Sequence, residues 1–159
     1  MNKKRLVTKD KVKRLKKKLS DATPVKPRIS RKNRKRTWCE QAVQDLLDEM
    51  KVPYEIEIPL PFKLSWKHYD IGLSDHAILI EVDGDYWHGN KEVLSEEQKI
   101  NWMQMKNKQN DLLKGWLAKT KGYTLIRIWE NDIKTDVPAV RAKILKVIRE
   151  VKSLKESKE

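Results

Sequence analysis

The amino-acid sequence predicts a mixed α/β domain, in which helices flank a four-stranded mixed sheet in the order α-β-β-β-α-β-α. Two apolar runs rich in β-branched and aromatic residues, 78–82 and 123–129, are typical of buried strands. Between them, 92–121 contains no proline and can form a long helix. A helix between two strands favours parallel pairing through a right-handed crossover, so we expect parallel and antiparallel pairs in one sheet.

The first helix is expected from Thr37 to about Lys51. Thr37 and Glu40 have the spacing of a capping box, in which each side chain satisfies a backbone N–H at the start of a helix. The dipeptide Val52-Pro53 ends the helix because proline cannot continue the hydrogen-bond pattern.

Three strands follow the first helix. Alternation predicts the first over 54–58, ended by Pro59 and Pro61, and the second over 69–73. A turn at 74–76 leads into the strand at 78–82, so these three strands are expected to form an antiparallel meander.

The second half of the chain supplies the long helix, the fourth strand and a last helix. Gly122 fits the C-terminal stop of the long helix, and Pro138 lies near the first turn of the last one. The apolar residues of the long helix are expected to face the sheet: Ile100, Met103, Leu112, Leu113, Trp116 and Leu117. The tryptophans expected in the core are Trp38, Trp116 and Trp129.

The positive charge of the protein is concentrated at its N-terminal end. The whole chain carries a net charge of +13, whereas residues 1–36 alone carry 17 Lys and Arg against two acids, a net +15 that leaves −2 for the remainder. We therefore expect a basic arm at 1–36, with a helix over 9–19 that orders on nucleic acid, and a near-neutral folded domain at 37–159.

The arm is expected to bind DNA phosphates, because neutralising phosphates releases condensed counterions. A tail that only improves solubility is the alternative. The densest basic cluster supplies the predicted DNA-binding residues Arg31, Lys32, Arg34, Lys35 and Arg36.

A single cysteine, Cys39, bounds the chemistry and the compartment. One thiol cannot form a disulfide framework or a cysteine-based zinc site within the chain, so no zinc is expected. A reducing compartment, the cytoplasm, is predicted. No apolar run of the length needed to cross a bilayer occurs, and no membrane partner is expected.

Three carboxylates gather near the ends of adjacent predicted strands. Side chains alternate along a strand, so Glu81 and Asp83 point to one face, and Asp70 lies on the preceding strand. Hard divalent cations prefer oxygen ligands, and the Val82 carbonyl could add another. His88 follows this strand and has a pKa suited to general acid or base chemistry.

These residues resemble a known family. The pattern Asp70…Glu81-x-Asp83, with Tyr86-Trp87-His88, Asn110-Asp111 and Gly122-Tyr-x-Leu-Ile-Arg-Ile-Trp-Glu130, is similar to the PD-(D/E)XK nuclease core. It looks like the very-short-patch-repair-like branch and, within that branch, the EDxHD phage homing endonucleases. The resemblance covers roughly 37–133 and implies a restriction-endonuclease-like core.

The resemblance also implies roles at the metal. Asp70 would be the principal ligand and the Val82 carbonyl the second, while Glu81 takes the acidic position of the nuclease motif. Asp83 stands where the wider superfamily has its lysine, and the branch is thought to give the work of that lysine to His88.

The remaining implied roles lie around this centre. Asp111 would orient His88 or hold a proton, and Glu40 would hold a metal-bound water. Tyr86 and Trp87 match aromatics that wedge into the duplex. The zinc-binding cysteines of the repair enzymes are absent, which argues against mismatch repair itself.

The predicted function is hydrolysis of phosphodiesters in double-stranded DNA by a Mg²⁺-dependent endonuclease, with Mn²⁺ as an alternative ion. A freestanding phage-type homing endonuclease, acting in the host-cell cytoplasm, is the most specific version. With one active site per chain, cutting both strands needs either a homodimer or two successive nicks. The alternatives are a non-catalytic basic nucleic-acid-binding protein and a junction resolvase or transposase-type nuclease on the same core.

Overall fold

The computed structural model describes residues 36–90, 93 and 101–157. In this part of the chain the elements are α2 (Trp38–Glu49), β1 (Glu55–Phe62), β2 (Ser65–Leu73), the short 3₁₀ turn η1 (Ser74–His76), β3 (Ile78–Asp83), α3 (Asp85–His88), α4 (Trp102–Thr120), β4 (Thr124–Trp129), α5 (Glu130–Thr135) and α6 (Val137–Glu156). The predicted arm residues 1–35, with the helix expected at 9–19, lie outside the described residues.

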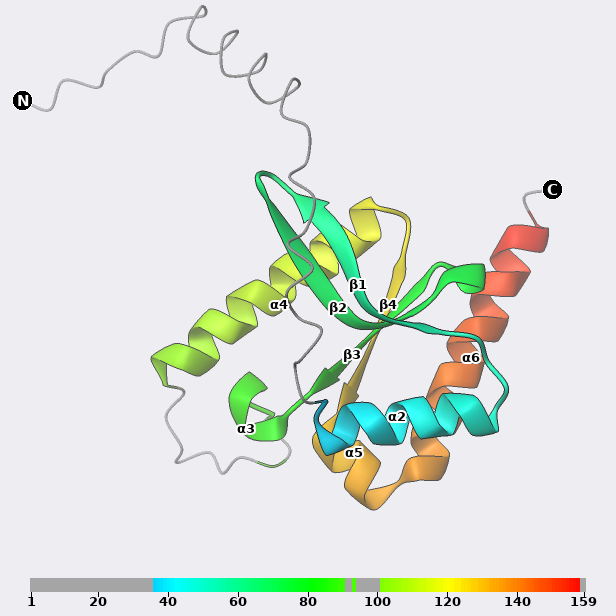
Figure 1. Cartoon of the computed structure of the whole chain (residues 1–159), viewed down its shortest axis with the longest axis horizontal. Coiled ribbons are helices and arrows are strands. Elements are labelled where there is room, and N and C mark those ends of the chain that lie inside the picture. The colour runs from blue at the N-terminus through cyan, green and yellow to red at the C-terminus, as the bar shows by residue number, and fades with distance from the viewer. Residues whose placement is uncertain (1–35, 91–92, 94–100, 158–159) are drawn as a thin grey trace, which may run out of the picture.

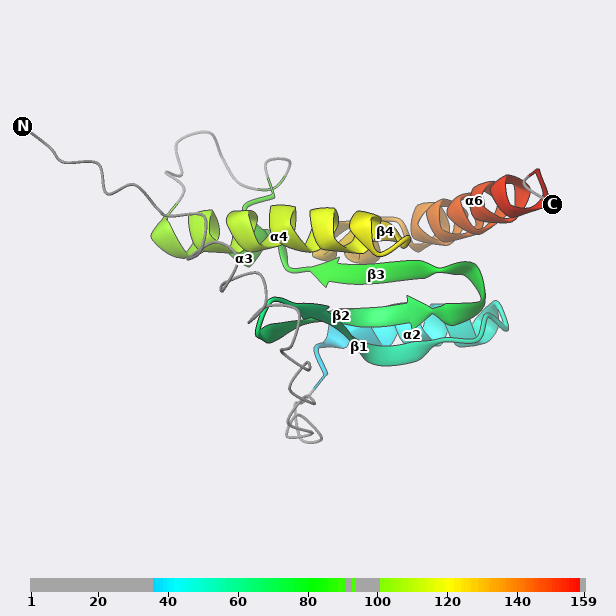
Figure 2. The ribbon, with the colours of Figure 1, turned by 90° about the horizontal axis from the view of Figure 1, so that it is seen from above.

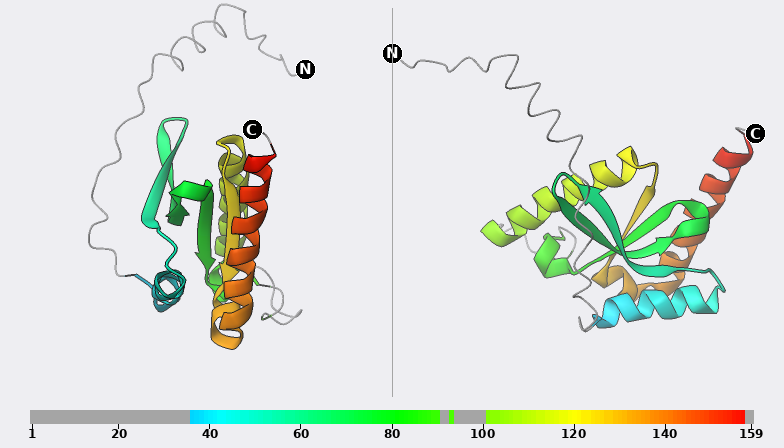
Figure 3. Two further views of the ribbon diagram at one scale, coloured as in Figure 1. Left: turned by 90° about the vertical axis from the view of Figure 1, so that its right-hand side faces the viewer. Right: turned by 45° about the horizontal axis from the view of Figure 1, so that its top comes forward.

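The four strands form one mixed sheet in the order β1-β2-β3-β4. The first three pair antiparallel, and β3 pairs with β4 in parallel after the chain crosses over through α4. Figures 2 and 3 show the strands following one another from the β1–β2 hairpin to β4. The predicted mixed α/β class, the meander and the parallel crossover are confirmed.

Each face of the sheet packs against its own group of helices. On one face α2, α5 and α6 cover the larger core, to which β2, β3 and β4 contribute isoleucines such as Ile71, Ile80 and Ile128. On the other face, among the described helices, α4 packs through Leu117 and Ala118 against a smaller cluster that contains Tyr69 and Leu79. The opposite placement of α4 and α2 is visible in Figure 1.

The first strand is longer than predicted. β1 continues through Pro59 and Pro61 to Phe62, although proline was expected to end it. β1 is the outer strand of the sheet, so a proline whose missing N–H lies on the unpaired side costs no ladder bond.

The long helix is shorter than predicted, and two of its apolar residues face away from the sheet. α4 begins at Trp102, where Asn101 and Gln104 form a capping box, and residues 92 and 94–100 of the predicted helix lie outside the described residues. Gly122 ends the helix region in a left-handed conformation, as predicted (φ 82°). Leu113 is half-buried and Leu117 buried, whereas Leu112 and Trp116 are exposed.

Two of the tryptophans predicted in the core lie nearer the surface. Trp38 was expected in the core but is exposed on α2, and Trp129 is half-buried at the end of β4.

No helix among the described residues is both long and apolar enough to cross a membrane.

Candidate active site

Strand β3 carries the acids on one face only. Ile80 and Val82 pack with the core under α2, α5 and α6. Glu81 and Asp83 therefore point to the α4 side, and both are buried. Their place beneath a helix means that each carboxylate needs a cation or a set of donors, since an unpaired buried charge is costly.

Asp70 is a residue of β2, and its side chain reaches the backbone of β3. The antiparallel ladder ends at the pair Ile71–Ile80, and beyond it the backbone N–H of Val82 donates to Asp70 Oδ2 at 2.9 Å. In an antiparallel pair the N–H and C=O of one residue point to the same side of the strand. The Val82 carbonyl therefore points to the same side of β3 as its N–H, toward β2 and Asp70.

The backbone on the far side of Asp70 is unusual. Glu57 of β1 lies opposite Asp70, between the pairs Ile56–Ile71 and Ile58–Tyr69, and it adopts φ 54°. A non-glycine residue in this region is uncommon and marks a local change in strand direction. On β2, Tyr69 and Ile71 flank Asp70 and pack into different core clusters.

A lysine from α4 meets Glu81. Lys114 Nζ donates to Glu81 Oε2 at 2.5 Å and lies 5.0 Å from the centre of the Tyr69 ring, while the Tyr69 hydroxyl donates to the Lys114 carbonyl at 2.8 Å. Burial raises the pKa of Glu81 to about 8, with the Lys114 charge opposing that rise. The second oxygen, Oε1, is buried and has no hydrogen-bond partner among the described residues.

Four charged side chains form a closed network beside this pair. His88 Nδ1 lies 2.7 Å from Asp111 Oδ2 and 3.6 Å from Asp83 Oδ1. Arg127 of β4 donates from Nη1 to Asp83 Oδ2 at 2.6 Å, and its Nη2 lies 3.3 Å from Asp111 Oδ1. The structure thus brings together three predicted site residues: Asp83 of β3, His88 of α3 and Asp111 of α4.

The network shifts the pKa values of its members. Burial would lower the pKa of His88, but the hydrogen bond to Asp111 and the charge of Asp83 outweigh it, so that this pKa is raised. Burial raises the pKa of Asp83 against the opposing charge of Arg127. For Asp111 the partners His88 and Arg127 outweigh burial and lower the pKa. The network therefore strengthens His88 as a base, and it favours the ionised form of Asp111 beside it.

Asp83, His88 and Asp111 could in principle hold a metal ion themselves. Each offers one ligand atom, and these atoms lie within 4.8 Å of one another. However, the guanidinium of Arg127 already contacts both carboxylates. A metal ion here would have to displace the Arg127 guanidinium from both carboxylates. The Asp70 side of β3 is therefore the better place for a divalent ion.

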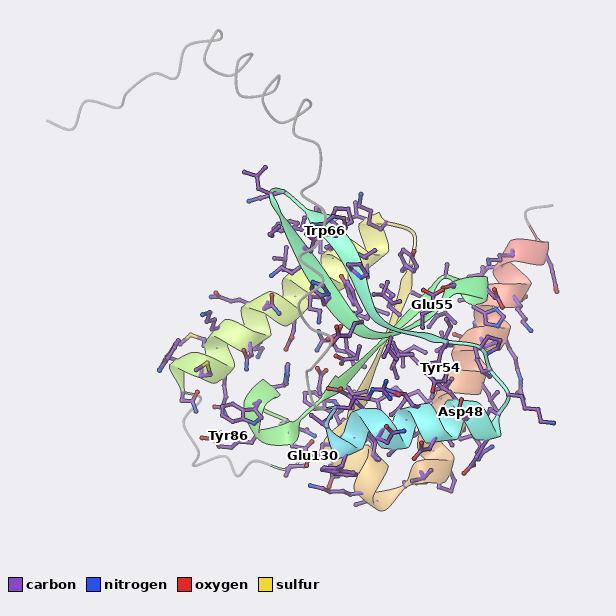
Figure 4. All side chains as sticks on the ribbon, in the orientation of Figure 1. Asp48, Tyr54, Glu55, Trp66, Tyr86 and Glu130 are labelled. Carbon is purple, nitrogen blue, oxygen red and sulfur yellow. The ribbon has the colours of Figure 1, made fainter. Side chains whose placement is uncertain are left out.

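The aromatic residues next to His88 project outward from α3. Tyr86 and Trp87 are exposed, and their rings meet edge to face at 5.3 Å. Their carbonyls accept hydrogen bonds from Gln104 (2.6 Å) and Asn107 (2.8 Å) of α4, which hold the short helix in place. Figure 4 shows Tyr86 at the outer side of α3.

Two predicted residues lie at α2. Glu40 is buried in its first turn, where the Thr37 hydroxyl accepts a hydrogen bond from the Glu40 N–H at 3.2 Å. Arg36 donates to the side chain of Gln44 at 3.1 Å. The other predicted DNA-binding residues of the arm, Arg31, Lys32, Arg34 and Lys35, lie outside the described residues, so their role stays a prediction.

Sequence reasoning missed Lys114 and Arg127. Each had a signal: Arg127 is the single charge in the apolar run that forms β4, and parallel register places it beside Glu81. Lys114 follows Asp111 by three positions, which puts both on the same side of a helix. The sequence alone did not show that these cations meet the acids of β3.

Comparisons with known proteins add a likeness of fold. No family model matches the chain, and no curated protein matches it. A solved structure described as the catalytic domain of the homing endonuclease I-Bth0305I matches with a TM-score of 0.50 and 22% sequence identity, over 73% of this chain and 98% of that one. At this identity the likeness establishes a shared fold and nothing about activity.

Proposed function

We propose that the protein is a divalent-metal-dependent DNA endonuclease of the PD-(D/E)XK type, in its very-short-patch-repair-like branch, and a homing endonuclease in its most specific form. The contact between Asp70 and Val82 carries this proposal. Here the Asp70 side chain, in place of a backbone carbonyl, accepts the hydrogen bond from the Val82 N–H between the two strands. Val82 lies between the buried Glu81 and Asp83, which belongs to the His88 network. The likeness of fold supports the same class of enzyme.

The residues around Asp70 fit a hard divalent cation. Asp70, the Val82 carbonyl and the unpartnered Glu81 Oε1 are oxygen donors, the kind that Mg²⁺ and Mn²⁺ take. Burial raises the pKa of Glu81, and a divalent cation bound at Oε1 would oppose that rise by stabilising the ionised carboxylate. A bound Mg²⁺ would neutralise charge on the phosphate and acidify a water molecule.

His88 is the proposed general base. Its Nδ1 is taken by Asp111, so Nε2 is the nitrogen that can accept a proton from the attacking water. The water oxygen bonds to phosphorus, the P–O bond to the leaving oxygen breaks, and solvent supplies the proton for that oxygen. Asp111 holds the tautomer and Asp83 stabilises the imidazolium, while Glu40 is proposed to hold a water molecule in the site.

Duplex binding is assigned to two surfaces. Tyr86 and Trp87 offer exposed rings to bases beside His88, and the basic arm at 1–36 offers charge to the phosphates. We assign residues 37–159 to the catalytic domain. A homodimer or two successive nicks would cut both strands.

The test is plasmid cleavage by the full chain with Mg²⁺ and with EDTA. We expect Mg²⁺-dependent cleavage that is lost in Asp70→Asn and in His88→Gln. Asp75→Asn and His76→Gln, in the 3₁₀ turn at the other end of β3, are the matched controls and should cut like the wild type. Cleavage that persists in Asp70→Asn, or in EDTA, contradicts the metal assignment.

One observation favours the second candidate, a non-catalytic nucleic-acid-binding protein. Arg127 and Lys114 already neutralise Asp83 and Glu81, so two of the buried acids have partners without any metal. That candidate predicts salt-sensitive DNA binding and no hydrolysis with any divalent ion. A non-catalytic binding protein does not require the Asp70 carboxylate at this position, and we rank this candidate second for that reason.

A further inference from the structure

We propose that the cavity beside His88 receives one base unstacked from a DNA strand, and that the preferred substrate carries an unpaired nucleotide next to the cut. This inference rests on the proposed function and names the form of its substrate. The cavity has a volume of about 680 Å³ and lies between α4, β4 and the residues that follow α3.

The walls of the cavity match the chemistry of a base. Trp116, Trp129 and Leu112 supply flat or apolar surface, and bases stack well on aromatic rings whatever their sequence. His88 and Lys108 lie at the same cavity, so that a bound base would have the proposed general base and a positive charge next to it. A base here would bring its own phosphate close to His88.

Two of these residues are exposed where a structural role would bury them. Trp116 is 57% exposed and Leu112 70% exposed, one helical turn apart on α4, while the neighbouring Leu117 packs into the core. Large apolar side chains gathered at a cavity mark binding surfaces more often than they mark folding contacts.

Gly115 supports the same reading. It lies in the interior of α4, where glycine disfavours the helix, and a Cβ atom added there would meet nothing within 4 Å. Its φ is not in the left-handed region, so neither packing nor backbone conformation requires a glycine. The missing side chain does leave the cavity open, because Gly115 lines it.

The positive charge around the cavity favours a polyanion as the molecule that binds there. Lys108 and Arg127 line the cavity with a single acid, Asp111, so a second copy docking through this face would bring like charges together. A polyanion is attracted to the same surface. Among polyanions, DNA supplies both the negative backbone and a flat base for the tryptophans.

The test is binding in EDTA, by fluorescence anisotropy of the full chain with two labelled duplexes. One duplex is fully paired, and the other has the same sequence with one extra unpaired thymidine. We expect the wild type to bind the second duplex about tenfold more tightly, from the stacking of one base. This preference should vanish in Gly115→Leu, which places a leucine side chain in the cavity next to Trp116, and in Trp116→Ala.

Gly115→Ala and Trp38→Ala are the matched controls and should keep the preference. Trp38 is also exposed, at 51%, but lies on α2. A second readout covers a Gly115→Leu variant that does not fold: 2-aminopurine at the unpaired position should be quenched by the wild type and by Trp38→Ala, and not by Trp116→Ala.

The outcomes separate this inference from the proposed function, because binding in EDTA needs no hydrolysis. A wild type without preference for the unpaired nucleotide overturns the base site, even if it cuts DNA. Equal preference or equal quenching in Trp116→Ala overturns it too. Preference without cleavage in Mg²⁺ overturns the endonuclease assignment and leaves the base site standing.

Discussion

Replacing Arg127 by methionine should destabilise the fold in a manner that depends on pH. The Asp83 side chain is only 1% exposed and is held by Arg127 at 2.6 Å, with His88 as its other charged neighbour at 3.6 Å. Removing one partner of a buried ion pair costs about 3–5 kcal/mol. Because His88 remains and Arg127 is itself 26% exposed, we expect the lower end, about 3 kcal/mol at neutral pH.

The pH dependence follows from the sign of the Asp83 shift. Burial already raises the pKa of Asp83 in the folded state, and loss of the opposing Arg127 charge raises it further. An acid with a raised folded pKa lowers stability progressively as pH rises from its unfolded to its folded pKa. The penalty of Arg127→Met should therefore be small in acid and grow by up to about 1.4 kcal/mol per pH unit.

Urea denaturation followed by tryptophan fluorescence, at about pH 5 and about pH 8, measures this. The double variant Asp83→Asn, Arg127→Met is the control, because it removes the charge that Arg127 neutralises. We expect it to recover most of the stability lost at the higher pH. A loss that is equal at both pH values, or a double variant no more stable than the single one, refutes the reasoning.

Three further predictions concern α3 and α4. Asp111→Asn removes the hydrogen bond that raises the pKa of His88, so that pKa should fall in an NMR titration, and the acid limb of the cleavage profile should move to lower pH; an unchanged pKa would show that Asp111 is not the cause. Trp87→Ala should weaken duplex binding by about tenfold in anisotropy measurements while Trp38→Ala does not, and equal losses would contradict a role specific to α3. Gly115→Ala should stabilise the protein by about 0.5–1 kcal/mol in thermal melts, since the added Cβ meets nothing, and a lower Tm would indicate an undetected contact.

The fold could be predicted well where local pattern decides it. The β-branched run of β3, the helix between β3 and β4 and the glycine at 122 each agree with the final architecture, and together they gave the mixed sheet. The prolines of β1 misled because their effect depends on whether the strand is an outer one. That is a property of the whole sheet and cannot be read from the strand itself.

The apolar pattern of α4 was ambiguous for a different reason. The helix carries two neighbouring apolar pairs, Leu113 with Leu117 and Leu112 with Trp116, and either could have faced the sheet. Only the packing of Leu117 against Tyr69 and Leu79 decides which pair is buried.

The acids of the candidate site were predictable and their cations were not. Alternation along β3 placed Glu81 and Asp83 on one face from sequence alone. The choice of Lys114 and Arg127 as partners depends on where α4 crosses β3 and on the parallel register with β4. Those are tertiary facts, and one sequence contains no direct signal for them.

The crossover through α4 also sets when in folding this site can exist. Asp83 and Arg127 are 44 positions apart, and the helix between them carries Asp111 and Lys114. Contacts of such separation form late, after the loop-closure entropy has been overcome. A copy arrested before β4 docks would still carry its positively charged N-terminal residues and the Asp70–Val82 contact, but Arg127 would not yet hold Asp83 and Asp111 together. The proposed cleavage of DNA should therefore require the completed fold.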